Sequence, residues 1–186
     1  MLEKLIQIDK QLFIFLNGLG SPTFDGLWLI ITQQAYWTPI FLLLLYLVYK
    51  KIGAKQTLIL LLFVAVLVAF TDQVTNLFKN HFQRLRPCND TSINTIIRAV
   101  KGSNSYSFFS GHAANTSAVA LFLFLNFRKK HKYFGLIFIW PMIFAYSRIY
   151  LGLHFPIDIL TGYFFGTTFG LLMFKIYQKI ISRQIT

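Results

Sequence analysis

The sequence predicts an all-α integral membrane protein, a helical bundle of about five transmembrane helices preceded by an amphipathic helix in the membrane interface. Hydrophobic residues make up 55% of the 186-residue chain, and charged residues make up only 13%. Such a composition is unlike that of an ordinary soluble domain. The apolar residues also gather into runs of about 20 residues, the length that a helix needs to cross the hydrocarbon core. We therefore expect a single membrane-embedded domain over residues 1–186.

The first segment of the chain has the spacing of an amphipathic helix. Its apolar residues are Leu2, Leu5, Ile6, Leu12, Phe13 and Leu16, and the polar residues Glu3, Gln7 and Lys10 lie opposite them. This periodicity predicts an interfacial helix. The turn-forming residues Asn17, Gly18, Ser21 and Pro22 end it, so the helix and its turn occupy residues 1–22. Charged residues interrupt this segment too early for a cleavable signal, so we expect internal spans to direct insertion.

Five apolar runs follow and form the predicted transmembrane core, residues 27–180. They cover residues 27–49, 57–80, 111–127, 133–151 and 157–180. Each run predicts one transmembrane helix, although Gln33, Gln34 and Pro39 interrupt the first, and the third is short.

Basic residues between the predicted spans indicate the orientation of the bundle. They are Lys50, Lys51 and Lys55 after the first span, Arg128, Lys129, Lys130 and Lys132 after the third, and Lys179 and Arg183 at the end of the last. Cytoplasmic loops are enriched in lysine and arginine, so we expect these loops to face the cytoplasm. The amino terminus and residues 84–110 and 151–156 then face the exterior. The small size, the lack of a cleavable signal and the single cysteine, Cys88, favour a bacterial cytoplasmic (inner) membrane.

The net charge of +12 does not predict a nucleic-acid partner, because the basic residues form short clusters between apolar runs. The expected partners are the lipid bilayer and a membrane lipid substrate. The sequence carries no sign of an oligomeric state. Cys88 alone builds neither a disulfide nor a cysteine zinc site.

Three polar clusters sit at the ends of spans on the predicted outer face. Residues 79–87 read KNHFQRLRP, residues 110–112 read SGH, and residues 147–158 read SRIYLGLHFPID. They contain Lys79, Arg86, Ser110, Gly111, His112, Arg148, His154 and Asp158. A single cation at a span end usually only reaches the interface, but the convergence of three clusters predicts one pocket at the membrane surface.

The spacing of these clusters resembles the signature of the type 2 phosphatidic acid phosphatase superfamily, which also contains the vanadium-dependent haloperoxidases. That signature is K-x6-R-P, then P-S-G-H, then S-R-x5-H-x3-D. The matching residues are Lys79, Arg86 and Pro87, then residues 110–112, then Ser147, Arg148, His154 and Asp158. Phe109 stands where the family has proline, and we expect this change to loosen the approach to Ser110. The resemblance implies a helical membrane phosphatase.

Phosphoryl transfer explains why these residue types occur together. A phosphoryl group in transfer spreads negative charge over its equatorial oxygens, so catalysis needs fixed donors and positive charge around it. Lys79, Arg86 and Arg148 supply the charge, and the arginines also offer bidentate contacts. We expect Ser110 to cap the third span, so that its first backbone N–H groups, from Gly111 and the next residue, point at the same oxygens.

Displacement of an alkoxide from phosphorus needs a nucleophile and a proton donor, and two histidines are available. We assign the attack to His154. Pro156 suits the first position of the last helix, which leaves Asp158 one turn along, where it can hold the other nitrogen of His154. His112 then protonates the leaving oxygen and afterwards activates the water that hydrolyses the phosphohistidine. The resemblance implies the same roles.

No metal and no other cofactor is expected. Magnesium and calcium prefer several carboxylate or carbonyl oxygens, whereas Asp158 stands beside three cations. Those cations would also oppose a zinc ion held by two histidines and Asp158.

Asp72, Asn76 and Lys79 share one face of the second predicted span. Asp72 either supports Lys79 or another cation of the site, or makes a structural polar contact between helices, and we favour the structural contact. Asn76 and Ser147 are further candidates for such support. His81 and Arg84 occupy positions that the signature leaves variable, so they receive no role.

The sequence thus predicts a metal-independent enzyme that hydrolyses a lipid phosphate or pyrophosphate at the outer membrane face. The resemblance implies substrates such as undecaprenyl pyrophosphate, phosphatidylglycerol phosphate, phosphatidic acid or a lipid A phosphate. A non-catalytic phospholipid-binding or transport protein that uses the same basic pocket is the alternative, and vanadate-dependent peroxidase chemistry is another. Residues 88–109 either gate the site or only connect two spans.

Overall fold

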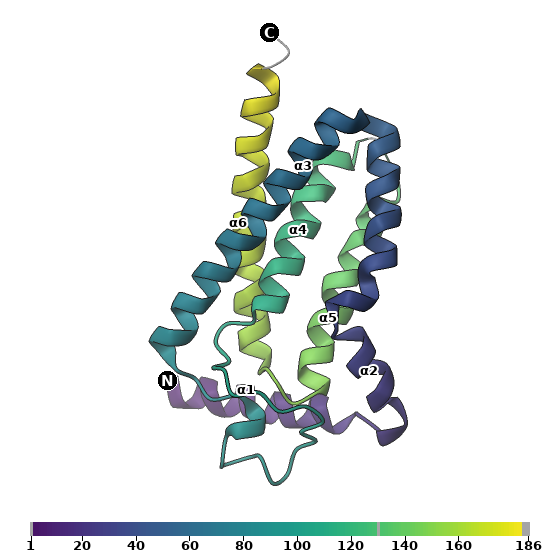
Figure 1. Cartoon of the computed structure of the whole chain (residues 1–186). Helices are drawn as coiled ribbons and strands as arrows, with labels where there is room; N and C mark the ends of the chain where they lie inside the picture. Colours follow the sequence, from purple (N-terminus) through teal and green to yellow (C-terminus); the bar gives the residue numbers. More distant parts are fainter. Residues whose placement is uncertain (1, 130, 184–186) are drawn as a thin grey trace.

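The structure is a computed structural model that describes residues 2–129 and 131–183. Every regular element in these two ranges is helical, as the sequence predicts. The α-helices are α1 (Leu2–Gly18), α2 (Asp25–Ile31), α3 (Thr38–Phe82), α4 (Gly111–Phe127), α5 (Ile139–Tyr150) and α6 (Pro156–Arg183). Short 3-10 helices cover Pro22–Phe24, Gln34–Trp37, Pro87–Asn89 and Phe134–Phe138. Figure 1 shows α3 to α6 as a bundle, with α1 lying across its lower end.

The predicted number of five membrane spans is not confirmed. Two helical stretches are long and apolar enough to cross a membrane, Gln34–Asn89 and Pro156–Ile181. A pair bent by 80°, Glu3–Gly18 with Pro22–Ile31, would be a third. Helices α4 and α5 have 17 and 12 residues. Both are shorter than the ~20 residues that a straight crossing needs.

Gly53 divides α3 into two arms. Its φ of 78° and ψ of 171° lie outside the helical region, in a conformation that glycine adopts readily because it has no Cβ. Figure 1 shows the two arms running back from a shared tip at the upper end. The second arm contains the whole of the second predicted span, residues 57–80.

The first predicted span, residues 27–49, is wrong as a single helix. Helix α2 ends at Ile31, and α3 begins only at Thr38, after the 3-10 helix. Pro39 explains this late start, because proline lacks a backbone N–H and fits the first turn of a helix. The fourth predicted span, residues 133–151, is shortened in the same way, since Pro141 lies in the first turn of α5.

Helix α6 packs directly against the backbone of α4 through a row of glycines. A Cβ atom on Gly162 would lie 2.7 Å from the carbonyl oxygen of Ser110. A Cβ atom on Gly166 would lie 2.2 Å from the carbonyl oxygen of Ala114. A Cβ atom on Gly170 would lie 2.5 Å from the carbonyl oxygen of Ala118, one turn further along α4. Small residues permit such close approach in membrane bundles. The first turns of α4 and α6, which carry predicted site residues, are therefore held together.

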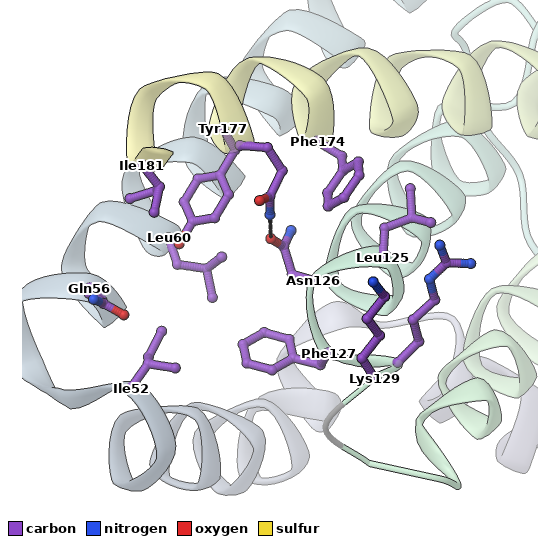
Figure 2. A pocket seen from close by; sticks show the side chains of 12 residues that line it. Ile52, Gln56, Leu60, Leu125, Asn126, Phe127, Lys129, Phe174, Tyr177 and Ile181 are labelled. Carbon is purple, nitrogen blue, oxygen red and sulfur yellow. Dashed lines mark hydrogen bonds between the residues drawn. The ribbon is translucent and has the colours of Figure 1, made fainter. Parts of the chain in front are cut away.

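The basic loops lie at the end of the bundle opposite the predicted site (Figure 1). They carry Lys50, Lys51, Lys55, Arg128, Lys129 and Lys132, while Lys130 lies outside the described residues. A cavity of about 430 Å³ opens there between α3, α4 and α6. Figure 2 shows its lining, in which Nε2 of Gln178 donates to Oδ1 of Asn126 at 2.9 Å. This separation of the two ends agrees with the predicted topology, and the side that each end faces stays a prediction.

Helix α1 contributes to the core as well as to the surface. Its outer face exposes Leu5, Ile6, Ile8, Leu12 and Phe15. Its inner face carries Phe13 and two polar residues, Asp9 and Asn17, which are buried. Nδ2 of Asn17 donates to the carbonyl oxygens of Ile149 and Tyr150, both at 3.0 Å, and so helps to satisfy the carbonyl groups at the end of α5. Helix α1 therefore closes the end of the bundle at which the predicted site lies.

Candidate active site

Arg86 and His154 are in direct contact, although they lie 68 residues apart in the chain. Nη1 of Arg86 lies 3.1 Å from Nε2 of His154 and also donates to the carbonyl oxygen of Leu153 at 2.9 Å. Nε and Nη2 of Arg86 donate to the carbonyl oxygen and Oγ of Ser105, both at 2.8 Å. A guanidinium only donates, so Nε2 of His154 must accept. This hydrogen-bond network assigns the proton of the neutral ring to Nδ1.

Asp158 faces that protonated nitrogen. Its Oδ2 lies 3.4 Å from Nδ1 of His154, an ion-pair distance rather than that of a short hydrogen bond, and accepts from the backbone N–H of Phe155 at 2.9 Å. Pro156 is the first residue of α6, as predicted. Both His154 and Asp158 are buried. The histidine and the carboxylate thus lie at ion-pair distance, but Nδ1 of His154 has no hydrogen-bond partner among the described residues, so the orienting role of Asp158 stays a prediction.

Burial lowers the pKa of the His154 imidazole well below its ordinary value of 6.5, and the positive charges of Arg86, Arg148 and Lys79 lower it further. The ring is therefore neutral at physiological pH. A neutral imidazole with its proton on Nδ1 has an unprotonated Nε2, whose lone pair is what a nucleophile requires.

Ser110 caps α4, as predicted. Its Oγ accepts from the backbone N–H of Ala113 at 3.4 Å, and its own backbone N–H donates to the carbonyl oxygen of Asp158 at 3.0 Å. Gly111 begins the helix and lies against α3, because a Cβ there would be 3.2 Å from Cγ2 of Thr75. The first N–H groups of a helix have no partner within it, so the start of α4 has the character of an anion site.

His112 and Lys79 form the more accessible part of the cluster, since both are only partly buried. The His112 ring stacks on Phe144, with centroids 5.3 Å apart and an interplanar angle of 23°. The His112 ring interacts electrostatically with the cations Arg148, Lys79 and Arg86, and also with the His154 ring. The two predicted catalytic histidines and the three predicted cations therefore gather at one place.

Arg148 is held by a residue that the sequence analysis does not identify. Its Nη1 donates to Oγ1 of Thr32, in the break between α2 and α3, at 2.5 Å. Its Nε is buried and has no hydrogen-bond partner among the described residues. Buried donors are normally paired, so this atom is suited to a ligand oxygen. Thr32 carries no sequence signal beyond its place in an interrupted apolar run.

The three residues predicted as supports, Asp72, Asn76 and Ser147, differ in their surroundings. Oδ1 of Asp72 accepts from Nδ2 of Asn115 at 2.6 Å, which is the structural contact between helices that we favour, although its charge also acts on Lys79. Asn76 is exposed on α3. Oγ of Ser147 donates to the carbonyl oxygen of Phe144, within its own helix, at 2.6 Å. The exposure of Asn76 and the contact of Ser147 within its own helix give no support to a role beside the cations.

Arg84 is the residue that the sequence analysis leaves without a role and that the structure places beside Asp158. Its Nη1 lies 2.6 Å from Oδ1 of Asp158, and its Nη2 lies 2.6 Å from Oδ2 of Asp9. The family signature gives no signal here. Asp9 does carry one, since it lies four residues before the apolar Phe13, a spacing that places both side chains on one side of a helix.

Phe109, which replaces the proline of the family signature, does not loosen this part of the site. It is fully buried and stacks on Phe165, with centroids 5.0 Å apart and an interplanar angle of 15°. A second contact, with Phe78, joins it to α3 at a centroid distance of 5.2 Å. Phe109, directly before Ser110, thus packs against both α3 and α6.

This chain is similar in sequence to known proteins. The profile of the PAP2 superfamily matches residues 56–182. A lipid A 4'-phosphatase of Bacteroides thetaiotaomicron is 35% identical over 98% of this chain and 83% of its own length. A lipid A 4'-phosphatase of Porphyromonas gingivalis is 32% identical over 99% of this chain and 79% of its own length.

A solved structure shares the fold. The transmembrane PAP2-type phosphatidylglycerolphosphate phosphatase from Bacillus subtilis superimposes with a TM-score of 0.71, covering 95% of this chain and 88% of that one. The two sequences are 19% identical, so the likeness concerns the fold.

Proposed function

This chain belongs to the PAP2 superfamily of phosphatases, and from this premise we propose that it hydrolyses a phosphate ester of lipid A through a phosphohistidine at His154. The contact between Arg86 and His154 carries the proposal. It joins a cation suited to phosphate oxygens to an imidazole whose Nε2 is unprotonated.

The relatives support lipid A as the substrate. Both of those described above are named lipid A 4'-phosphatase, and each aligns with nearly the whole of this chain. Among the substrates that the sequence suggests, a lipid A phosphate is therefore the one that we propose. The fatty acyl chains of such a substrate remain in the bilayer while its phosphate reaches the charged end of the bundle.

In the first step, the lone pair on Nε2 of His154 attacks phosphorus, and the bond between phosphorus and the sugar oxygen breaks. His112, in its protonated form, gives its proton to the leaving oxygen. The negative charge of the substrate phosphate favours that protonated form. Asp158 stabilises the positive charge of the phosphorylated ring through the proton on Nδ1.

In the second step, neutral His112 takes a proton from water, and the water oxygen attacks phosphorus. The bond between phosphorus and Nε2 breaks, which returns His154 to its neutral state and releases inorganic phosphate. Arg86, Arg148 and Lys79 hold the equatorial oxygens in both steps. Proton, nucleophile and charge are thus all supplied by side chains.

We also propose that the site faces the exterior of a bacterial inner membrane. The basic loops at the opposite end of the bundle support this orientation. Cys88 tests it, because it is the only cysteine and lies two residues after Arg86. An impermeant maleimide should label Cys88 in intact spheroplasts. Labelling that occurs only in inverted vesicles would contradict the orientation.

The enzymatic proposal is tested with purified protein in detergent, offered bis-phosphorylated lipid A, undecaprenyl pyrophosphate, phosphatidylglycerol phosphate and phosphatidic acid. We expect phosphate release to be fastest from lipid A, and a phosphorylated His154 after an alkaline quench. His154→Asn should abolish release while lipid binding remains. His131→Ala, at the exposed far end of the bundle, is the matched control and should keep full activity. Activity that persists in His154→Asn would overturn the mechanism, and faster release from another lipid would overturn the substrate.

A further inference from the structure

One guanidinium joins two buried carboxylates that come from the two ends of the chain. The side chains of Asp9 and Asp158 are 1% and 0% exposed. An oxygen of each carboxylate lies 2.6 Å from a guanidinium nitrogen of Arg84. Two anions in a buried place repel each other and are poorly solvated, so the shared cation is what makes their proximity possible. Arg84 is therefore an internal part of this end of the bundle.

The contact determines which oxygen of Asp158 faces the nucleophile. Nη1 of Arg84 occupies Oδ1, whereas Oδ2 accepts from the backbone N–H of Phe155 and faces Nδ1 of His154. A carboxylate held by donors on both oxygens cannot rotate. The guanidinium is itself fixed, because it lies over the Phe155 ring at 4.1 Å from its centroid.

Asp9 completes the arrangement from α1. Its Oδ2 accepts from Arg84, and its Oδ1 accepts from the backbone N–H of Ile157 at 2.9 Å. Ile157 is the second residue of α6, where backbone N–H groups have no partner within the helix. Asp9 thus fixes both the guanidinium and the first turn that carries Asp158. Phe13, one turn along α1, packs edge-on against Phe155 at 5.3 Å.

We propose that Arg84 and Asp9 are positioning residues for the phosphatase reaction, which together set the orientation of Asp158 and, through it, of His154. Helix α1 is then part of the catalytic apparatus, in addition to its predicted place in the membrane interface. This inference depends on the proposed role of His154 as nucleophile.

Asp9→Asn is the decisive variant, because it keeps the shape of the side chain and removes the charge that holds Arg84. We expect kcat to fall about 10-fold or more, since misplacement of a catalytic group strongly slows the reaction, while KM stays within about twofold. Formation of the phosphoenzyme, measured in a rapid quench, should slow by the same factor. Arg84→Lys keeps one charge but lacks the fork that spans two carboxylates, so it should also lose kcat.

Lys10→Gln is the matched control. Lys10 also lies on α1 and pairs with a loop carboxylate, Asp90, at 2.7 Å, but it has no contact with Asp158. It should leave kcat within about twofold. Arg84→Lys combined with Asp9→Asn should lose little more kcat than Arg84→Lys alone, because the two residues act in one chain of contacts.

The inference is wrong if Asp9→Asn keeps the kcat of the parent protein. It is also wrong if the loss of activity matches the loss of folded protein, measured by thermal unfolding of the same samples, because that indicates a structural role only. Failure of the proposed function looks different, since His154→Asn would then remain active.

Discussion

Nη1 of Arg86 lies 3.1 Å from Nε2 of His154 and directs its N–H at the lone pair that we propose as the nucleophile. A phosphate oxygen that takes this N–H in place of Nε2 frees the lone pair beside the phosphorus atom. In the proposed mechanism, Arg86 then has two functions. It keeps the ring in the tautomer that reacts, and it couples phosphate binding to exposure of the nucleophile.

Arg86→Lys should lower kcat/KM about 100-fold or more, the size of effect seen when one donor to a developing anion is removed. A lysine ammonium cannot donate at once to Ser105, Leu153 and a phosphate oxygen as the guanidinium fork can. Steady-state phosphate release measures the change. Arg128→Lys, in a basic loop at the opposite end, is the control and should stay within about twofold. Equal activity of the two variants would show that the fork is not needed.

The pH dependence of kcat/KM should have its acid limb below pH 6.5. Because the pKa of His154 is lowered in the folded protein, the ring remains unprotonated as the pH falls through the ordinary histidine range. Activity that depends on the neutral ring is then lost only at still lower pH. Rates measured at subsaturating substrate between pH 4.5 and 8 report this limb. A decline centred at or above pH 6.5 would contradict a buried, neutral nucleophile.

Gly166→Ala should destabilise the bundle by about 1–3 kcal/mol, the usual cost of adding a methyl group to a packed core. The new Cβ would lie 2.2 Å from both the carbonyl oxygen of Ala114 and Oγ of Ser117, so α4 and α6 must separate. Thermal unfolding in detergent measures the change, and activity should fall with it. Gly26→Ala is the control, because among the described residues nothing beyond its chain neighbours and its own helix backbone lies within 4 Å of its Cβ position.

Activity should survive a strong chelator and should be inhibited by vanadate, which mimics a phosphoryl group in transfer. Within residues 2–129 and 131–183, no group of three or more His, Cys, Asp or Glu side chains is placed to hold a metal ion. In the proposed mechanism, the charges of Arg86, Arg148 and Lys79 take the role that a divalent ion has in metal-dependent phosphatases. Phosphate release after dialysis against EDTA provides the test. Loss of activity that one added metal restores would refute this prediction.

Local patterns in the sequence predict the fold class and most of the candidate site. The cap at Ser110 and the helix start at Pro156 follow from rules that need only neighbouring residues. The signature spacings also predict that His112 and His154 meet, because each lies at the end of a helix on one face of the bundle.

The contacts missed by the sequence analysis depend on tertiary placement. Arg84 and Asp9 are 75 residues apart, and neither spacing nor periodicity relates them. Thr32 contacts Arg148 only because the chain breaks between α2 and α3, where hydropathy alone suggests one continuous span. Asp9 shows how much can be recovered, since a carboxylate beside an apolar helix residue points to a polar partner inside the fold.

The glycine row has a consequence for how such a protein adapts. Because α6 touches the α4 backbone, the spacing between their first turns does not depend on the side chains that face lipid. Leu160, Phe164, Leu171, Leu172 and Ile176 on the other sides of α6 are exposed. These positions can exchange one apolar side chain for another as bilayers differ in thickness or fluidity. The lipid-facing residues of α6 can therefore vary with the composition of the bilayer, while the distance between the first turns of α4 and α6 stays the same.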